Sequence, residues 1–284
     1  MKKFASVMVI FGVILLSGIG FVYYTEGAVA FSMKSITLEE SHEISAKKIT
    51  ELNINTLSTD VELLPHNKED IIVELNGQVS EKMKDAYQLT VEENDGVLNV
   101  KLDRKSKPSF SVFAINKGVT LTVLIPEKKY DEIVIESKSG DVNVEDLTAD
   151  RMLFKAASGD MVVENLSARD IAIQTTSGDT FANGISADVL NMEAVSGDMT
   201  GEKLTAVSEM TLHAKSGDII LNTTVEAYRL DFEGTSGDGI VKVPGFLYKE
   251  KEEDRINGTF GDDAADEGIL IIKVRTTSGD FTLE

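Results

Sequence analysis

Apolar and polar residues alternate through most of the chain after residue 48, and in the second half this alternation repeats with a nearly fixed period. The repeat is marked by a Ser-Gly-Asp triplet, whose serine recurs after 19, 19, 19, 20, 20 and 42 residues. Counted back from each triplet aspartate, the positions eight and six residues earlier are apolar in all seven copies. The position four residues earlier is always small. A period of this size is typical of a solenoid, whose units bury their apolar sides only by stacking on one another.

Alternation on both sides of the triplet predicts a strand, a tight turn and a second strand in every repeat. A further apolar position follows six residues after the aspartate, at Leu147, Leu166, Ile185 and Leu204, which indicates a second corner. A coil of this length has a contour of about 60 Å, which suits a flattened or three-sided tube with a dry interior. We therefore predict an all-β fold, a parallel β-solenoid (β-helix) with coils of 19 to 20 residues over 127–284. A right-handed winding is the default for parallel crossovers.

The triplets supply the residues that a sharp corner needs. Glycine provides positive φ, while serine and aspartate oxygens can accept hydrogen bonds from backbone N–H groups that lack a ladder partner. The predicted turn glycines are Gly140, Gly159, Gly178, Gly197, Gly217, Gly237 and Gly279.

Stacking of the corners predicts a column of aspartates with a spacing of about 4.8 Å. Stacked carboxylates resemble the oxygen-rich sites that calcium prefers. The candidate calcium ligands are Asp141, Asp160, Asp179, Asp198, Asp218 and Asp238. The calcium-binding nonapeptide repeat, however, has a shorter period and a denser glycine and aspartate pattern. Each coil here offers one triplet aspartate, so turn capping is the favoured interpretation and we predict no metal ion and no cofactor.

The chain between residues 46 and 126 departs from the repeat. Ser58-Thr59-Asp60 occupies the place of a triplet and predicts a degenerate first coil. Residues 71–125 favour longer antiparallel strands, including a hairpin at Asp95-Gly96, that cover this coil. The basic stretch 101–107 is either a plain loop of this extension or a partner-binding loop. Residues 25–45 show no clear period and are predicted to form a stalk.

The last spacing contains a charged, glycine-rich stretch at 249–266, which we predict to be a surface loop extruded from the solenoid. The last coil, Ile269 to Leu283, returns to the repeat pattern and ends the chain, and we expect it to present an open parallel edge. An open parallel edge there would favour contact with another chain.

The N-terminus predicts a membrane anchor. Residues 4–24 are apolar or uncharged, and as a helix they would span about 31 Å, close to the hydrocarbon thickness of a bilayer. Lys2 and Lys3 before this segment and Glu26 after it predict a cytoplasmic start and an extracytoplasmic remainder. We therefore predict one transmembrane helix over 1–24 and location at the cell membrane. Ala28-Val29-Ala30 leaves signal-peptide cleavage after Ala30 as an alternative.

Composition narrows the function mainly by exclusion. A net charge of −20 argues against partners such as nucleic acid or an anionic lipid surface, which need a basic patch. The absence of cysteine excludes disulfides, thiolate metal sites and a thiol nucleophile. The three histidines lie in unrelated contexts, and no catalytic triad, metal-binding spacing or phosphate loop can be assembled. We therefore predict no catalytic residue and no enzymatic activity.

Taken together, a basic start, one apolar segment, a strand ending at Ile125-Pro126 and repeated coils that close with Ser278-Gly279-Asp280 resemble the bacterial "putative adhesin" domain family of unknown function. The resemblance implies a surface-exposed β-solenoid attached to the cell envelope, with a role in adhesion or the envelope stress response. It supplies no catalytic or binding residue.

We accordingly expect a non-enzymatic envelope protein that presents its solenoid to the cell wall or to a protein partner. The alternative is a glycan-binding or glycan-cleaving β-helix protein, either dependent on calcium or independent of it.

Overall fold

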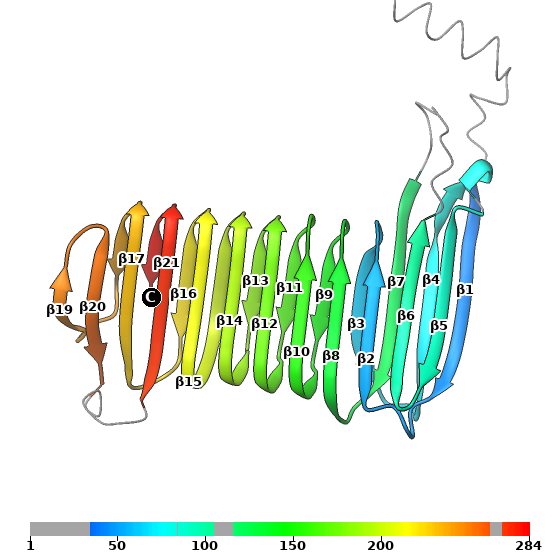
Figure 1. Ribbon diagram of the computed structural model, residues 1–284, viewed down its shortest axis with the longest axis horizontal. Coiled ribbons are helices and arrows are strands. Elements are labelled where there is room, and N and C mark those ends of the chain that lie inside the picture. The colour runs from blue at the N-terminus through cyan, green and yellow to red at the C-terminus, as the bar shows by residue number, and fades with distance from the viewer. Residues whose placement is uncertain (1–34, 84, 105–115, 262–268) are drawn as a thin grey trace, which may run out of the picture.

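The structure is a computed structural model that describes residues 35–83, 85–104, 116–261 and 269–284. Its strands lie side by side in a flat stack of two sheets, sheet A and sheet B, which face each other across one apolar core (Figure 1). The long strand β15 (Met199–Ser216) turns from sheet A into sheet B, so all 22 strands belong to one continuous hydrogen-bonded sheet. The predicted all-β parallel solenoid is confirmed.

Both sheets run from one end of the stack to the other. In spatial order, sheet A contains β1 (Ser35–Ser45), β4 (Asp70–Ser80), β7 (Asn116–Pro126), β3 (Asp60–His66), β9 (Val142–Glu145), β11 (Met161–Glu164), β13 (Thr180–Asn183), the start of β15, β16 (Ile219–Thr223), β22 (Phe281–Leu283) and β18 (Gly239–Val241). In the same order, sheet B contains β5 (Tyr87–Asn94), β6 (Val97–Arg104), β2 (Glu51–Thr56), β8 (Lys129–Ser137), β10 (Thr148–Ala156), β12 (Ser167–Ser177), β14 (Ser186–Ser196), the end of β15, β21 (Leu270–Ser278), β17 (Tyr228–Ser236), β20 (Arg255–Phe260) and β19 (Leu247–Lys251). A short 3-10 helix, η2 (Glu81–Met83), follows β4.

Neighbouring strands are parallel from β7 to β18 in sheet A and from β6 to β17 in sheet B. The strands beyond these limits pair antiparallel and form a cap at each end of the stack. Figure 1 shows β1, β4 and β5 at one end and β19 and β20 at the other.

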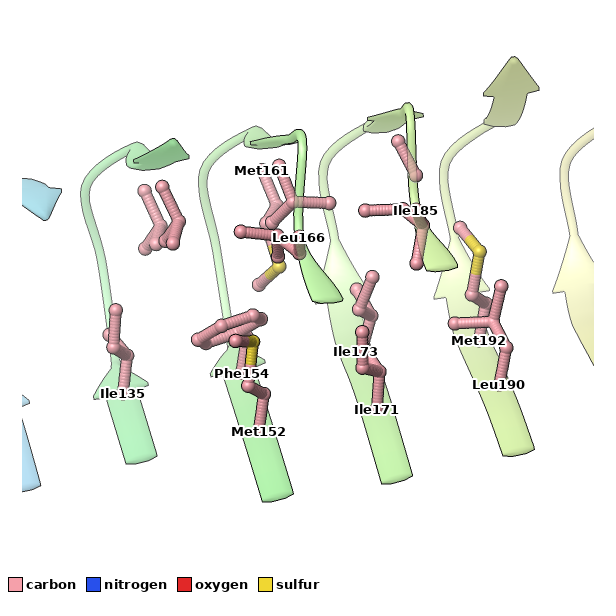
Figure 2. Close-up of a cluster of buried hydrophobic side chains, with 14 of the residues drawn as sticks. Ile135, Met152, Phe154, Met161, Leu166, Ile171, Ile173, Ile185, Leu190 and Met192 are labelled. Carbon is pink, nitrogen blue, oxygen red and sulfur yellow. The ribbon is translucent and has the colours of Figure 1, made fainter. Parts of the chain in front are cut away.

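The core consists of columns of equivalent side chains from successive coils. Ile135, Phe154 and Ile173 stand in register on adjacent strands, and each is at most 1% exposed. Figure 2 shows these columns, with Leu166 and Ile185 from the second corner pointing into the same interior. Burial of one such side chain contributes about 1.5–3 kcal/mol. A coil can gain this free energy only when a neighbour covers its apolar edge, which is why the repeat must stack.

The coil from Ser196 to Ser216 is one residue longer than those before it because β15 contains a bulge. Ala187 pairs with Ala206 whereas Val189 pairs with Glu209, so β15 has one more residue than β14 in this span. The bulge leaves Val207 65% exposed. The extra residue of this coil therefore lies on the outside of the tube, and the core columns stay in register.

The N-terminal part differs from the prediction in two ways. Residues 35–45, which were expected in a stalk, form β1 and pair antiparallel with β4 along their whole length. The hairpin at Asp95-Gly96 is confirmed, and both residues have positive φ, as its tight turn requires. Strands β6 and β7, however, lie parallel to β2 and β3 and form another coil outside them.

The degenerate coil β2–β3 is consequently held between two other coils. The chain leaves β7 at Pro126 and crosses to β8 past the coil that it skips. At this crossing Lys128 donates hydrogen bonds from Nζ to the carbonyl oxygens of Ala46, at 2.7 Å, and Ile49. The Lys128 ammonium also lies 4.9 Å from the ring centroid of Tyr130. Burial lowers the pKa of Lys128, and the nearby Asp131 carboxylate opposes this effect. Lys128 thus links the segment between β7 and β8 to the chain just before β2.

The C-terminal end also differs from the prediction, because here too one coil lies between two others. The last coil does not end the stack, because β21 pairs with both β15 and β17 and β22 pairs with both β16 and β18. The loop predicted at 249–266 is also wrong for residues 249–260, which largely form the antiparallel hairpin β19–β20 on the edge of sheet B. Its charged residues occupy outward positions and the turn, while Ile256 and Gly258 are buried. The open parallel edge inferred from the last coil is therefore absent among the described residues of sheet B.

The predicted anchor, residues 4–24, lies outside the described residues. Within the described ranges, no helix combines the length and the apolarity needed to cross a membrane.

A glycine substitution tests what sets the stacking distance. Gly178 has a φ of 116°, and a Cβ there would lie 2.1 Å from the carbonyl oxygen of Gly159 in the next coil. Gly178→Ala should therefore lower the free energy of unfolding by at least about 3 kcal/mol, since it adds a backbone collision to the strain of positive φ.

Gly245→Ala is the matched control, because φ is 87° but nothing lies within 4 Å of the added Cβ. It should cost only about 1 kcal/mol. Urea denaturation of both variants measures the difference. Equal losses would show that φ strain alone makes glycine necessary at the corner.

Candidate functional site

A continuous column of aspartate side chains runs along the corner that joins sheet B to sheet A. Each aspartate except the last, Asp238, accepts at Oδ1 a hydrogen bond from the backbone N–H of the aspartate in the adjacent coil, over 2.8–3.0 Å. In spatial order the column contains Asp60, Asp141, Asp160, Asp179, Asp198, Asp218, Asp280 and Asp238. The structure thus brings the six candidate aspartates together and adds Asp60 and Asp280, which sequence reasoning had not counted among them.

The hydrogen bonds explain how like charges can follow one another so closely. Strand spacing places successive carboxylates about 4.8 Å apart, and the N–H bond that each accepts offsets part of their repulsion. The aspartate side chains are exposed, and none of the ion pairs between described residues involves them. In the part of the chain that the structure describes, no group of three or more acidic or histidine side chains is placed to hold a metal ion.

The triplet glycines all have φ between 110° and 159°. A second corner, five residues after the triplet aspartate, also has positive φ in four successive coils, at Asp146, Asn165, Gly184 and Lys203. Asp, Asn and Gly are the residues that tolerate this conformation best. The apolar position that follows them had predicted a second corner, and the recurrence of Asp, Asn and Gly at one position of the repeat was the further signal that could have placed it at this residue. The Asn165 amide also donates to Asp146 Oδ1 at 2.9 Å, which links two of these corners.

A groove runs along the outer face of sheet B, beside the aspartate column. Its volume is about 540 Å³. The small residues that precede the triplets, among them Ser137, Ala156 and Thr175, contribute to its lining. The charged and titratable side chains that line it are Glu136, Lys138, Lys155, Glu193, His213 and Lys215. It can therefore offer hydrogen bonds and charges of both signs, but no Phe, Tyr or Trp is among the described residues that line it.

The two carboxylates of this groove do not form a catalytic pair. Glu136, Lys155, Gln174 and Glu193 stand on four successive strands, so three strand spacings place the two glutamates about 14 Å apart. Glycoside hydrolysis requires a carboxylate separation of about 5–9.5 Å. Lys155 lies 3.6 Å from Glu136, and Gln174 lies 3.4 Å from Glu193, so neighbouring side chains engage both carboxylates.

Elsewhere the outer face of sheet B is covered by ion pairs between neighbouring strands. The hydrogen bond from Lys129, together with the charge of Arg169, lowers the pKa of Asp150. A hydrogen bond from Lys273 likewise lowers the pKa of Glu209. At the far end, Arg275 binds Asp231 at 3.0 Å. Most acidic side chains of this face therefore have a cationic partner.

The histidines and the basic stretch form no common site. His42 pairs with Glu40 at 2.8 Å on β1, and His66 lies 2.8 Å from the carbonyl oxygen of Asp70. His213 lies in the groove of sheet B. Of the basic stretch 101–107, residues 101–104 belong to β6 and the remainder lies outside the described residues.

A protein-family model, Toastrack DUF4097, matches residues 49–245 and again residues 131–284. These ranges include all the coils and the aspartate column. The chain belongs to the Toastrack DUF4097 family. The family assignment rests on this model, and no curated protein matches the chain.

Several solved structures are similar to this Toastrack chain at low identity. A "putative cell adhesion protein" from Clostridium sporogenes is 12% identical, with 87% of this chain and 99% of that chain covered and a TM-score of 0.41. A "putative adhesin" from Bacteroides fragilis is 12% identical, with 89% and 98% covered and a TM-score of 0.47. A "putative lipid binding protein" from Parabacteroides distasonis is 12% identical, with 87% and 97% covered and a TM-score of 0.27.

The aspartate column can be tested by separating hydrogen bonding from charge. Asp179→Ala removes the acceptor of the Asp198 N–H and should lower the free energy of unfolding by about 1 kcal/mol. Asp179→Asn keeps an acceptor oxygen at the same place and removes one negative charge from a crowded column. It should be as stable as the unchanged chain or more stable, as measured by urea denaturation. An Asn variant as unstable as the Ala variant would mean that charge, and not the hydrogen bond, holds the column together.

Calcium binding can be tested on the same column. Because the Oδ1 of every column aspartate except Asp238 already accepts a bond from a backbone N–H and the carboxylates form a line rather than a cage, micromolar calcium should not raise the melting temperature of the full chain. Magnesium at the same concentration controls for screening of charge. A saturable rise with calcium alone, lost in Asp179→Asn, would instead establish the column as a calcium site.

Proposed function

We propose that this Toastrack protein is a non-enzymatic protein of the cell envelope, anchored in the cell membrane through residues 4–24 and presenting its solenoid outside the cell to the cell wall or to a protein partner. The observation that carries the proposal is the extended pair of outer faces. The aspartate column alone joins eight coils through seven hydrogen bonds, a length of about 34 Å at one strand spacing per step. A rigid surface of this kind suits contact with a large partner better than the enclosure of a small substrate.

Charge and sequence support the same proposal. A net charge of −20 favours solubility and repels anionic lipid and nucleic acid, so the uncharged N-terminal segment is the part suited to hold the chain at a membrane. The basic start, the single apolar segment and the repeat together resemble LiaG, a membrane-anchored protein encoded with a cell-envelope stress-response system of Bacillus and its relatives. A role in adhesion or in the envelope stress response is therefore part of the proposal.

Binding of a glycan in the groove of sheet B is the second candidate, which its volume and its mixed polar lining support. Cleavage of a glycan is not part of this candidate, because the glutamates of the groove are too far apart for it.

Because the chain has no cysteine, single cysteines can test the orientation. Thr235 is exposed on β17, and Thr235→Cys should react with a membrane-impermeant maleimide in intact cells. Lys3→Cys is the matched control and should react only after the cells are permeabilised, because the positive-inside rule places it in the cytoplasm. Labelling is measured by a shift in gel mobility. Protection of Cys at position 235 in intact cells would overturn the proposed location.

A further inference from the structure

The outer face of sheet A carries a row of largely apolar side chains where a solvated sheet face would normally be polar. The row crosses six adjacent strands, and each member is paired in register with the next. It consists of Val162, Phe181, Thr200, Ile220, Thr282 and Ile240. Ile220 is 43% exposed and Ile240 is 49% exposed, whereas Val162 and Phe181 are half-buried by their neighbours on the sheet. A phenylalanine and three β-branched apolar residues in one outward row leave apolar area that the described part of the chain does not cover.

Acidic side chains flank this row on both sides. The aspartate column lies two residues before it on each strand. Two residues after it, in strand order, stand Glu164, Asn183, Glu202, Asn222, Glu284 and Lys242, and Glu145 is directly opposite Glu164 on the next strand. Like charges directly opposite each other on neighbouring strands destabilise a sheet, and amide groups from Asn143 and Asn183 only partly relieve them.

Cations are scarce on this face, in contrast to sheet B. Along the described parallel strands of sheet A from β3 to β18 and the residue that follows each, the lysines are Lys203 and Lys242. Lys203 is exposed at the second corner, next to Glu202, and Lys242 is already bound to Glu284 at 2.6 Å. The face thus combines an uncovered apolar row with an excess of negative charge.

We propose that the outer face of sheet A docks a basic amphipathic helix of a partner protein, which lies along the stack with its apolar side on the row and its lysines or arginines over the two acidic columns. This inference rests on the proposed function and names the chemistry of the partner. The dimensions agree with it. Five strand spacings make the row about 24 Å long, equal to about 16 helical residues. The acidic columns are about 13 Å apart, which accommodates one helix of about 10–12 Å.

Other occupants fit the same face less well. A second copy of this chain would bring acidic columns against acidic columns, and an anionic lipid surface or polymer would meet the same repulsion. Free divalent cations would neutralise the carboxylates but would leave the apolar row uncovered. An extended basic strand would space its charges at about 6.6 Å, whereas a helix repeats them every 5.4 Å, closer to the 4.8 Å of the columns.

The test measures the binding of a fluorescent 18-residue leucine-lysine peptide, designed as an amphipathic helix, to the full chain in a nonionic detergent. Fluorescence anisotropy should show saturable binding that weakens as salt is raised. Phe181→Thr combined with Ile220→Thr should weaken binding at least tenfold, because it removes apolar contact while keeping residues that the row already contains. Glu164→Gln combined with Glu202→Gln should also weaken binding and reduce its salt dependence.

Matched controls lie on the outer face of sheet B. Val134 and Leu153 are half-buried and paired in register, so Val134→Thr with Leu153→Thr makes a comparable apolar change on the opposite face. Glu136→Gln with Glu193→Gln makes the same change in net charge as the sheet A glutamate pair. Both controls should bind within twofold of the unchanged chain, and melting curves verify that every variant is folded.

If the sheet B variants lost as much peptide affinity as the sheet A variants, the peptide would be attracted by net charge alone, and the inference would be overturned. Equally strong binding of a peptide with serine in place of leucine would also overturn it, since the apolar row would then contribute nothing. Thr235→Cys still labelled in intact cells, with no peptide binding, would reject the docking surface and leave the proposed function standing. Protection of that cysteine would reject the proposed function whatever the peptide result.

Discussion

The architecture depends on how closely the backbones of successive coils approach at the triplet corner. With no Cβ at Gly178 or its equivalents, the carbonyl group of one corner can lie where a side chain would start in the next, and this contact recurs from Gly140 to Gly279. The corners therefore stack at strand spacing without a gap. Once they do, the next residue in each coil is held with its carboxylate below the N–H of its neighbour. The columns of the core, the aspartate column and the two outer faces all follow from this one contact.

Both ends of the stack share one arrangement of coils. At each end one coil is placed between two others: β2–β3 lies between β6–β7 and β8–β9, and β21–β22 lies between β15–β16 and β17–β18. Antiparallel strands then cover the outermost coil in both sheets at the N-terminal end and in sheet B at the C-terminal end, where β18 is the edge of sheet A. Parallel edges are prone to pairing with other chains, so this arrangement limits unwanted association. It also makes both ends rich in contacts between residues far apart in the sequence, which delays their closure during folding.

The sequence predicted the repeating part of this fold well because each repeat carries its own evidence. Alternation identified inward and outward residues, and the triplet identified the corner. Alternation does not, however, specify which strand a given strand will pair with, so the insertion of the last coil beside Ser216 was not foreseeable from its pattern. The charged stretch at 249–260 was mistaken for a loop because its buried residues, such as Ile256, are few and its outward residues are all polar or charged.

The same limit applies to the candidate surfaces. Sequence reasoning found the aspartates because they lie in the triplet, but it missed the outward row of sheet A because alternation does not show which outward residues of different coils share a row. Only the register of the strands shows that four apolar side chains from four coils stand in one row, with Thr200 and Thr282 among them. The two faces also place opposite demands on the chain. Ion pairs satisfy many of the charges of sheet B internally, whereas much of the repulsion on sheet A remains unless a cationic group arrives. A fold held together by uncharged contacts at its corners can tolerate that repulsion, and the acidic face is then free to recognise a partner.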